Sequence, residues 1–187
     1  DRLNFNNDHF SVAARSEKTP VITLNGVSKV YYAPGWRVGY MAFHDPHNNL
    51  SDIRDGVEKL LRSRLCPSTP AQYGYTAGLL ENEDWMKSYL NSIKERCDQC
   101  VSRINSIRGL SVQPPQGAFY MFVKLTDDKW YNNDKSFVLS LLEEKHVLAV
   151  HGSGFSLEYG KGHFRIVFLP SMKILNDVFN RIDSFLN

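Results

Sequence analysis

The sequence predicts an α/β protein in which short strands and amphipathic helices are mixed along the chain. Three observations support this fold class. Of the 187 residues, 42% are hydrophobic and 12% aromatic, which is enough to bury a sizeable core. Several short apolar runs are typical of strands. One long stretch, 85–107, has apolar residues at helical spacing.

The first part of the chain is expected to form a polar surface segment followed by two strands and two helices. Apolar runs predict the strands, and we expect the first of them to be buried. A Ser-Asp pair that can cap a helix, an apolar stripe and later prolines predict where the helices begin and end. The expected elements are a surface segment at 1–20, strands at 21–25 and 39–43 with a loop at 31–36 between them, and helices at 52–65 and 72–80.

The second part is expected to begin with the long helix and to continue as a compact mixture of strands and helices. Gly109 follows the long helix as a C-terminal cap would. Such a mixture is typical of an α+β domain. The expected elements are a helix at 85–107, strands at 110–112 and 118–124, a helix at 135–144, strands at 147–150 and 164–168, and a final helix with its apolar face at Leu175, Val178, Phe179, Ile182 and Phe185.

Composition excludes several classes of function. The net charge is +2, from 22 basic and 20 acidic residues spread along the chain, so nothing indicates nucleic acid or an anionic membrane as a partner. No apolar run approaches the roughly 20 residues of a membrane span. Three cysteines argue for a reducing compartment, and we expect a soluble, cytoplasmic protein.

No metal site is predicted. Cys97 and Cys100 form a C-x-x-C pair, but they lie on the apolar stripe of the long helix, where buried packing is the better interpretation. Zinc would need two further ligands. His44 and His47 flank a turn, and no ligand cluster follows them.

The first candidate for chemistry is Lys29, which comes shortly after the apolar run at 21–24. Its amine is expected at the carboxyl edge of the strand, where open α/β sheets bind ligands. Burial lowers a lysine pKa and leaves a nucleophilic amine, and Arg37 can grip a phosphate through paired hydrogen bonds. A lysine with a phosphate clamp suggests pyridoxal phosphate. The alternatives are a solvated lysine, a surface arginine in a glycine turn, and, for Ser28, a loop hydroxyl that caps the turn.

The second candidate is Arg165, the one charge inside an apolar strand. Alternation places Phe164 and Ile166 on one face of that strand and Arg165 with Val167 on the other. An arginine in a buried strand needs an anion, and an α-carboxylate would answer that need through a two-pronged salt bridge. The alternative is an arginine on an exposed face of the sheet.

Five segments of the chain resemble one known family. The segment NGVSKVYYAPGWRVGY (25–40) resembles the cofactor-lysine segment of fold-type I pyridoxal-phosphate aminotransferases, and HFRIVFLP (163–170) resembles the strand that carries their substrate-carboxylate arginine. PQGAFY (115–120) and HGSGF (151–155) follow the family's order. Within the family, RSRLCPSTPAQ (62–72) looks most like prokaryotic alanine aminotransferases. The resemblance covers essentially the whole chain.

The resemblance implies roles for particular residues. Lys29 would hold pyridoxal 5'-phosphate as a Schiff base and then act as general base and acid, while Arg37 and Ser28 would bind the cofactor phosphate. Arg165 would bind the substrate carboxylate. The partners would be small molecules, an amino acid and a 2-oxo acid, with L-alanine and 2-oxoglutarate favoured. The full-length family members are dimers, so a homodimer is expected.

The resemblance also implies an organisation. Residues 1–84 would be a remnant of the large cofactor-binding domain, 85–107 the interdomain helix and 108–187 the small domain of a PLP-dependent transferase fold. The family's partners of the pyridine ring are expected ahead of Asp1, so we expect the C-terminal half of an aminotransferase, inactive alone. Two alternatives remain: a β-eliminating lyase of the same fold, and a non-catalytic structural or dimerisation fragment.

Overall fold

The structure of the chain, a computed structural model, describes residues 2–5, 9–81 and 84–187. Positions 1 and 6–8 of the predicted surface segment, and 82–83 before the long helix, lie outside the described residues. The described chain divides into two compact units. The first unit holds Arg2 and 9–81, and the second holds 3–5 and 84–187.

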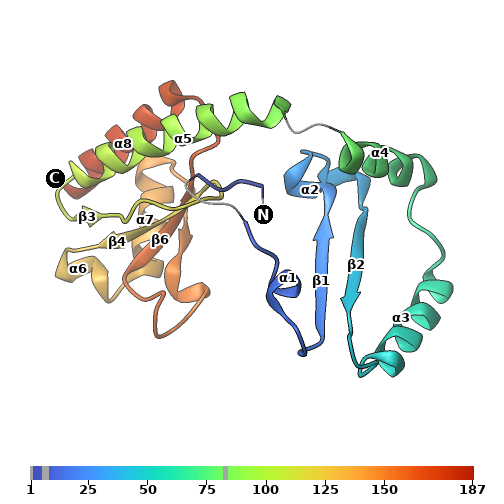
Figure 1. Cartoon of the computed structure of the whole chain (residues 1–187). Helices are drawn as coiled ribbons and strands as arrows, with labels where there is room; N and C mark the ends of the chain where they lie inside the picture. The colour runs from blue at the N-terminus through green and yellow to red at the C-terminus, as the bar shows by residue number, and fades with distance from the viewer. Residues whose placement is uncertain (1, 6–8, 82–83) are drawn as a thin grey trace. The chain divides into compact units, whose positions relative to one another are not determined.

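The first unit consists of a two-stranded antiparallel sheet, two longer helices and short helical turns (Figure 1). The strands pair along their full length, from Val21 opposite His44 to Gly26 opposite Gly39. The elements are α1 (Val12–Arg15), β1 (Val21–Gly26), α2 (Val27–Val30), the 3-10 turn η1 (Pro34–Trp36), β2 (Gly39–His44), α3 (Ser51–Arg64) and α4 (Thr69–Leu80).

One prediction of burial in the first unit is wrong. β1 was expected to be buried, but Ile22 and Leu24 are 36% and 69% exposed. The helix α3 is within one residue of the predicted bounds. Its apolar stripe is not buried either, and Leu60 of that stripe is 72% exposed. Sequence pattern sets the secondary structure of both elements. Burial depends on what packs against them, and the described residues leave these apolar side chains at least partly exposed.

The buried core of the first unit is small and lies between α2, the start of β2 and α4. Val27, Val38, Ala71 and Tyr75 form this core, which Tyr31 and Ala33 extend. The core therefore fastens the turn after β1, which carries Lys29, to the helix α4.

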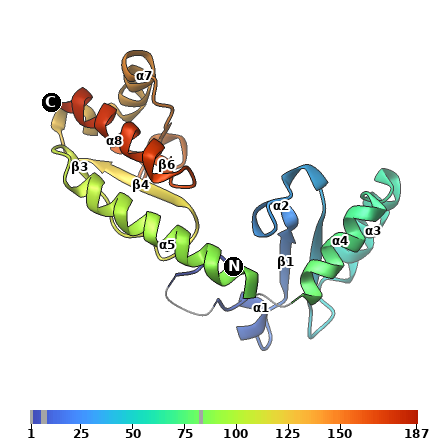
Figure 2. The same ribbon diagram turned by 90° about the horizontal axis from the view of Figure 1, so that it is seen from above.

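The second unit is a two-layer arrangement of helices on a four-stranded sheet (Figure 2). The strand order is β3-β4-β6-β5, and all neighbours are antiparallel. The helices α5 and α8 run side by side, joined by an ion pair of 3.0 Å between Arg103 and Asp183. The elements are α5 (Asp84–Asn105), β3 (Leu110–Ser111), β4 (Tyr120–Leu125), α6 (Asp128–Tyr131), α7 (Asp134–Lys145), β5 (Val150–His151), the 3-10 turn η2 (Gly152–Gly154), β6 (His163–Val167) and α8 (Met172–Leu186).

The register of β4 and β6 separates the two faces of this sheet. Met121 opposes Ile166 and Val123 opposes Phe164, and all four side chains are buried beneath the helices. Phe122 opposes Arg165 on the other face, where side chains stay partly exposed. The predicted alternation around Arg165 is therefore present.

The long helix α5 belongs wholly to the second unit, so the division of the chain lies at the start of the helix and not within it. Its buried stripe includes Cys97 and Cys100, which are 1% and 0% exposed. The prediction that both cysteines pack in the core is confirmed. Among the described residues, no helix is both long enough and apolar enough to cross a membrane.

Residues 3–5 join the second unit, although they were expected to belong to a surface segment leading to β1. Asn4 bridges Gly117, and the Leu3 carbonyl accepts a hydrogen bond of 2.7 Å from the Ala118 N–H. A Cβ on Gly117 would lie 2.4 Å from that carbonyl oxygen. The glycine of the PQGAFY segment thus allows a close approach of two backbones.

Candidate active site

Lys29 lies in α2, the helical turn that directly follows β1. Val27 is buried at one end of the turn, where its N–H donates to the Val38 carbonyl at 3.2 Å. Tyr31 closes the turn with a hydrogen bond of 3.0 Å to the Val27 carbonyl. The lysine therefore follows the carboxyl end of β1, as expected, and it lies in a helical turn that was not predicted.

The predicted desolvation of Lys29 is wrong for the described chain, because the Lys29 side chain is exposed. The side chains of Val27 and Tyr31 anchor the turn by packing in the small core. Lys29 lies between these two residues, on the exposed side of the turn. Among the described residues, no carboxylate forms an ion pair with Lys29. Its amine is thus available to a ligand.

Arg37 and Ser28 are in the same segment of the first unit. Arg37 ends η1 in the left-handed region, with φ of 54°, and its Nη1 donates to the Pro34 carbonyl at 2.8 Å. Ser28 is half-buried beside Lys29. Arg37 is exposed and, within the described part of the chain, has no carboxylate partner.

The helix α4 holds this segment in place through glycines four residues apart. The Tyr31 hydroxyl donates to the Gly78 carbonyl at 2.8 Å. The Trp36 ring packs against Gly74 so closely that a Cβ on this glycine would lie 2.6 Å from the nearest ring atom. The Tyr31 ring also contacts Tyr75 edge to face, with 5.8 Å between centroids. Burial, together with the phenols of Tyr40 and Tyr31, raises the pKa of Tyr75, so this central side chain stays neutral.

The donors on this segment fit pyridoxal phosphate. A primary amine suits an aldehyde, and a guanidinium with a neighbouring hydroxyl suits a phosphate. Lys29, Ser28 and Arg37 supply these groups, and no described carboxylate neutralises the two cations. The side chains are attached to a turn and a loop that pack on one helix. The chemistry of the donor set therefore matches the expected cofactor.

Arg165 is half-buried on β6, between Phe122 of β4 and Val150 of β5. Two aromatic rings pack against its guanidinium: the Cζ atom lies 4.5 Å from the Tyr120 ring centroid and 4.7 Å from that of Phe155. No described carboxylate pairs with it. The arginine is therefore held by aromatic contacts and remains without an anion within the described chain.

Sequence reasoning did not predict that Tyr120 and Phe155 contact Arg165. The segments with Tyr120 and Phe155 were noted for their order along the chain, and that order was the available signal. Asp134 gave no signal at all, yet it is buried and its Oδ2 accepts a hydrogen bond of 2.7 Å from the Ser153 N–H. This contact joins α7 to the loop that carries Phe155.

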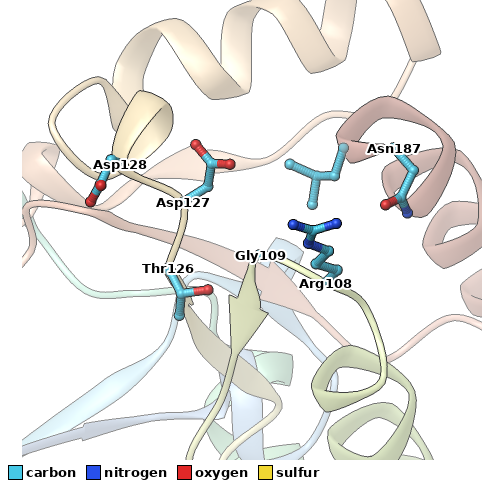
Figure 3. A pocket seen from close by; sticks show the side chains of 7 residues that line it. Arg108, Gly109, Thr126, Asp127, Asp128 and Asn187 are labelled. Atoms are coloured by element: carbon cyan, nitrogen blue, oxygen red, sulfur yellow. The ribbon is translucent and has the colours of Figure 1, made fainter.

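The described residues also form a cavity of about 570 Å³ that contains none of the predicted site residues (Figure 3). Arg108 lies beside Asn187 at the end of α8, and Thr126, Asp127 and Asp128 lie on the other side. Across the described ranges, no three His, Cys, Asp or Glu side chains are grouped to hold a metal ion. The predicted cationic residues thus remain the candidates for chemistry.

Comparison with known proteins gives a consistent result. Residues 2–181 match the family model described as aminotransferase class I and II. A glutamate-pyruvate aminotransferase of Haemophilus influenzae is 33% identical over 183 residues, 96% of this chain and 45% of that protein. An alanine aminotransferase of Mycobacterium tuberculosis is 31% identical over 181 residues, 95% of this chain and 42% of that protein.

Solved structures agree in fold. The alanine aminotransferase from Pyrococcus furiosus superposes with a TM-score of 0.93 at 49% identity, over 98% of this chain and 46% of that one. An aminotransferase from Escherichia coli gives a TM-score of 0.88 at 30% identity, with the same two coverages. The chain spans less than half the length of these relatives. Members of the matched family use pyridoxal 5'-phosphate, and this chain belongs to the class I and II aminotransferases.

Proposed function

We propose that the intact protein containing this chain is an aminotransferase that moves an amino group between L-alanine and 2-oxoglutarate, giving pyruvate and L-glutamate. One observation carries the proposal: Lys29, Ser28 and Arg37 are amine, hydroxyl and guanidinium donors on a single segment that packs on α4. The substrate pair rests on the names of the relatives, which are glutamate-pyruvate and alanine aminotransferases.

In this proposal Lys29 holds pyridoxal phosphate through its amine, and Arg37 with Ser28 binds the phosphate. When bound, the cofactor supplies an aldehyde and a ring that stabilises negative charge at the substrate α-carbon. After the amino group of the substrate displaces Lys29 from the cofactor, the freed Lys29 amine would remove the proton from the substrate α-carbon as a general base and, as an ammonium, would donate it to the former aldehyde carbon as a general acid. An amine without a carboxylate partner is suited to that exchange.

Arg165 binds the α-carboxylate of the amino acid or the 2-oxo acid in this proposal. Its planar guanidinium pairs with both carboxylate oxygens, which fixes the direction of the α-carbon. The rings of Tyr120 and Phe155 limit its rotation. We further propose a cytoplasmic homodimer, which rests on the resemblance to the family and is tested by sedimentation of the intact protein.

Substitution of Lys29 tests the proposed chemistry. The intact protein is expected to form glutamate from alanine and 2-oxoglutarate, and Lys29→Ala should lower that rate by about 10²–10⁴-fold or more through loss of the general base. Lys59→Ala is the matched control, because Lys59 is an exposed lysine of the same unit that pairs with Asp55. Activity of Lys29→Ala equal to that of the control would refute the role of Lys29.

Two further assays separate this proposal from its alternatives. A β-eliminating lyase would release a thiol, a 2-oxo acid and ammonia from cystathionine without consuming 2-oxoglutarate, whereas an aminotransferase consumes 2-oxoglutarate. We also propose that the 187-residue chain alone does not turn over, because partners of the pyridine ring are expected elsewhere in the intact protein. Steady formation of alanine-dependent glutamate by the pure chain would contradict that proposal.

A further inference from the structure

We propose that Asp134 is a positioning residue that holds Phe155 against the guanidinium of Arg165 and so orients this arginine for the substrate carboxylate. The inference deepens the proposed function and rests on the role of Arg165 in it. Asp134 acts through a loop and makes no contact with the arginine itself.

The first step is the burial of Asp134. At 4% exposure it is the one charged side chain buried within the described ranges. A buried carboxylate is costly unless hydrogen bonds compensate its lost hydration. Its Oδ2 accepts from the Ser153 N–H at 2.7 Å, and the His151 Nδ1 is farther away at 3.9 Å. The main compensation therefore comes from the backbone of the η2 loop.

The second step is the tight geometry of that loop. The Phe155 N–H donates to the Gly152 carbonyl at 2.8 Å, and the His151 Nδ1 lies 2.9 Å from the Ser153 Oγ. A Cβ on Gly152 would lie 2.1 Å from the Gly160 carbonyl oxygen, so the loop has little space for another path. A shift at Ser153 is therefore passed to Phe155, two residues on.

The third step is the weak burial of Phe155 itself. Its ring is 53% exposed and meets Phe122 edge to face, with 6.0 Å between centroids. Such a ring is held less by core packing than by its backbone. Tyr120, the other ring on Arg165, is built into β4. Of the two aromatic contacts of the guanidinium, one therefore depends on a strand and the other on the loop that Asp134 holds.

The test compares three variants of the intact protein. Asp134→Ala removes the acceptor of the Ser153 N–H, whereas Asp134→Asn keeps an acceptor oxygen at similar length. Asp127→Ala is the matched control, because Asp127 also accepts a backbone hydrogen bond, 2.8 Å from the Lys129 N–H, at the start of another helix of the same unit. Loss of either aspartate should lower stability, but only Asp134 is connected to Phe155.

Two readouts decide the proposal. The Nε–H resonance of Arg165, assigned with Arg165→Lys, carries ring-current shifts from Tyr120 and Phe155. That shift should shrink in Asp134→Ala and persist in Asp134→Asn and Asp127→Ala. The KM for alanine should rise about tenfold in Asp134→Ala alone, with the affinity for pyridoxal phosphate unchanged, since a displaced aromatic contact is worth about one factor of ten.

An unchanged Arg165 resonance in Asp134→Ala would overturn the connection between the two residues. A lost shift with an unchanged KM would overturn the positioning role. Equal changes in Asp127→Ala would assign the effect to general stability and would also overturn it. If the wild-type protein failed to transaminate at all, the proposed function would fall, while the resonance would still decide whether Asp134 sets the position of Phe155.

Discussion

Replacement of Gly78 by alanine is expected to loosen the segment that carries Lys29, although alanine is the better helix former. In an exposed helix interior this change gains about 1 kcal/mol of stability. On α4, however, the new Cβ would lie 2.9 Å from the Cε1 atom of Tyr31. Tyr31 is held by its hydrogen bond to the Gly78 carbonyl, by the edge of Tyr75 and by Arg2, whose Cζ lies 5.2 Å from the ring centroid.

The balance of these effects favours destabilisation. Overpacking costs about 1–3 kcal/mol. A displaced Tyr31 also loses a hydrogen bond worth about 0.5–1.5 kcal/mol. After the gain in helix propensity, the expected net loss is about 1–3 kcal/mol. Because the small core of the first unit joins this turn to α4, the loss should appear as local opening around α2.

Hydrogen exchange of the intact protein, followed by mass spectrometry on peptides that cover 27–38, measures this opening. Exchange in Gly78→Ala should accelerate about 5- to 100-fold there and stay unchanged in the second unit. Gly56→Ala is the matched control, since a Cβ on Gly56 of α3 meets nothing within 4 Å and should stabilise its helix. In Gly74→Ala, the 48% exposed Trp36 can swing aside, so the effect should be smaller. Exchange in Gly78→Ala as slow as in wild type would refute the argument.

Three further predictions concern the charged residues and the cysteines. Arg165→Lys should raise the KM for alanine about tenfold or more, because the bidentate pair with the carboxylate is lost, while the affinity for pyridoxal phosphate stays the same. Equal weakening of alanine binding and pyridoxal phosphate binding would contradict the role of Arg165. Arg37→Gln should weaken binding of pyridoxal phosphate but not of pyridoxal, as measured by equilibrium titration, and equal weakening of both would exclude a phosphate contact. Burial raises the pKa of Cys97 from 9.0 to about 11 and that of Cys100 to about 12, so both thiols keep their protons in the folded state as the pH passes 9.0 while the unfolded chain loses them. The contribution of the two thiols to stability should therefore be constant below that pH and fall above it, and the fall should be smaller in Cys100→Ala. A thiol reagent at about pH 8 should label only the exposed Cys66. Fast labelling of all three cysteines would contradict the burial of Cys97 and Cys100.

The second unit was the more predictable part of the fold because its helices and strands bury their apolar faces against one another. The stripe of α5 and the alternation of β6 both follow from packing partners within the described chain. The strand predicted at 147–150 forms only at Val150–His151. The first residue of the predicted strand, Val147, instead closes the end of α7. His146 ends this helix in the left-handed region, and the Val147 N–H donates to the Leu141 carbonyl at 3.4 Å.

The first unit shows what pattern cannot decide. The bounds of α3 and of both strands follow from spacing, but exposure does not, because the same stripe is buried or exposed according to its neighbours. The turn α2 is four residues long and too short to give a periodic signal, so the helical turn that contains Lys29 was not predicted. The lysine and both arginines could be selected from sequence alone. Asp134 could not, because its hydrogen-bond partner lies 19 residues away and only the folded chain brings them together.

The two units differ in what holds their functional residues. In the first unit, four buried residues of the described chain fasten the segment with Lys29 and Arg37. In the second unit, Arg165 is on a sheet whose other face belongs to a core in which 21 of the described residues are buried. Local stability follows the density of buried apolar contacts, so the segment with Lys29 and Arg37 should open far more readily than β6. This difference gives the proposed inactivity of the chain alone a second cause. Even with Arg165 held in place by its sheet, the proposed cofactor donors would be ordered only part of the time.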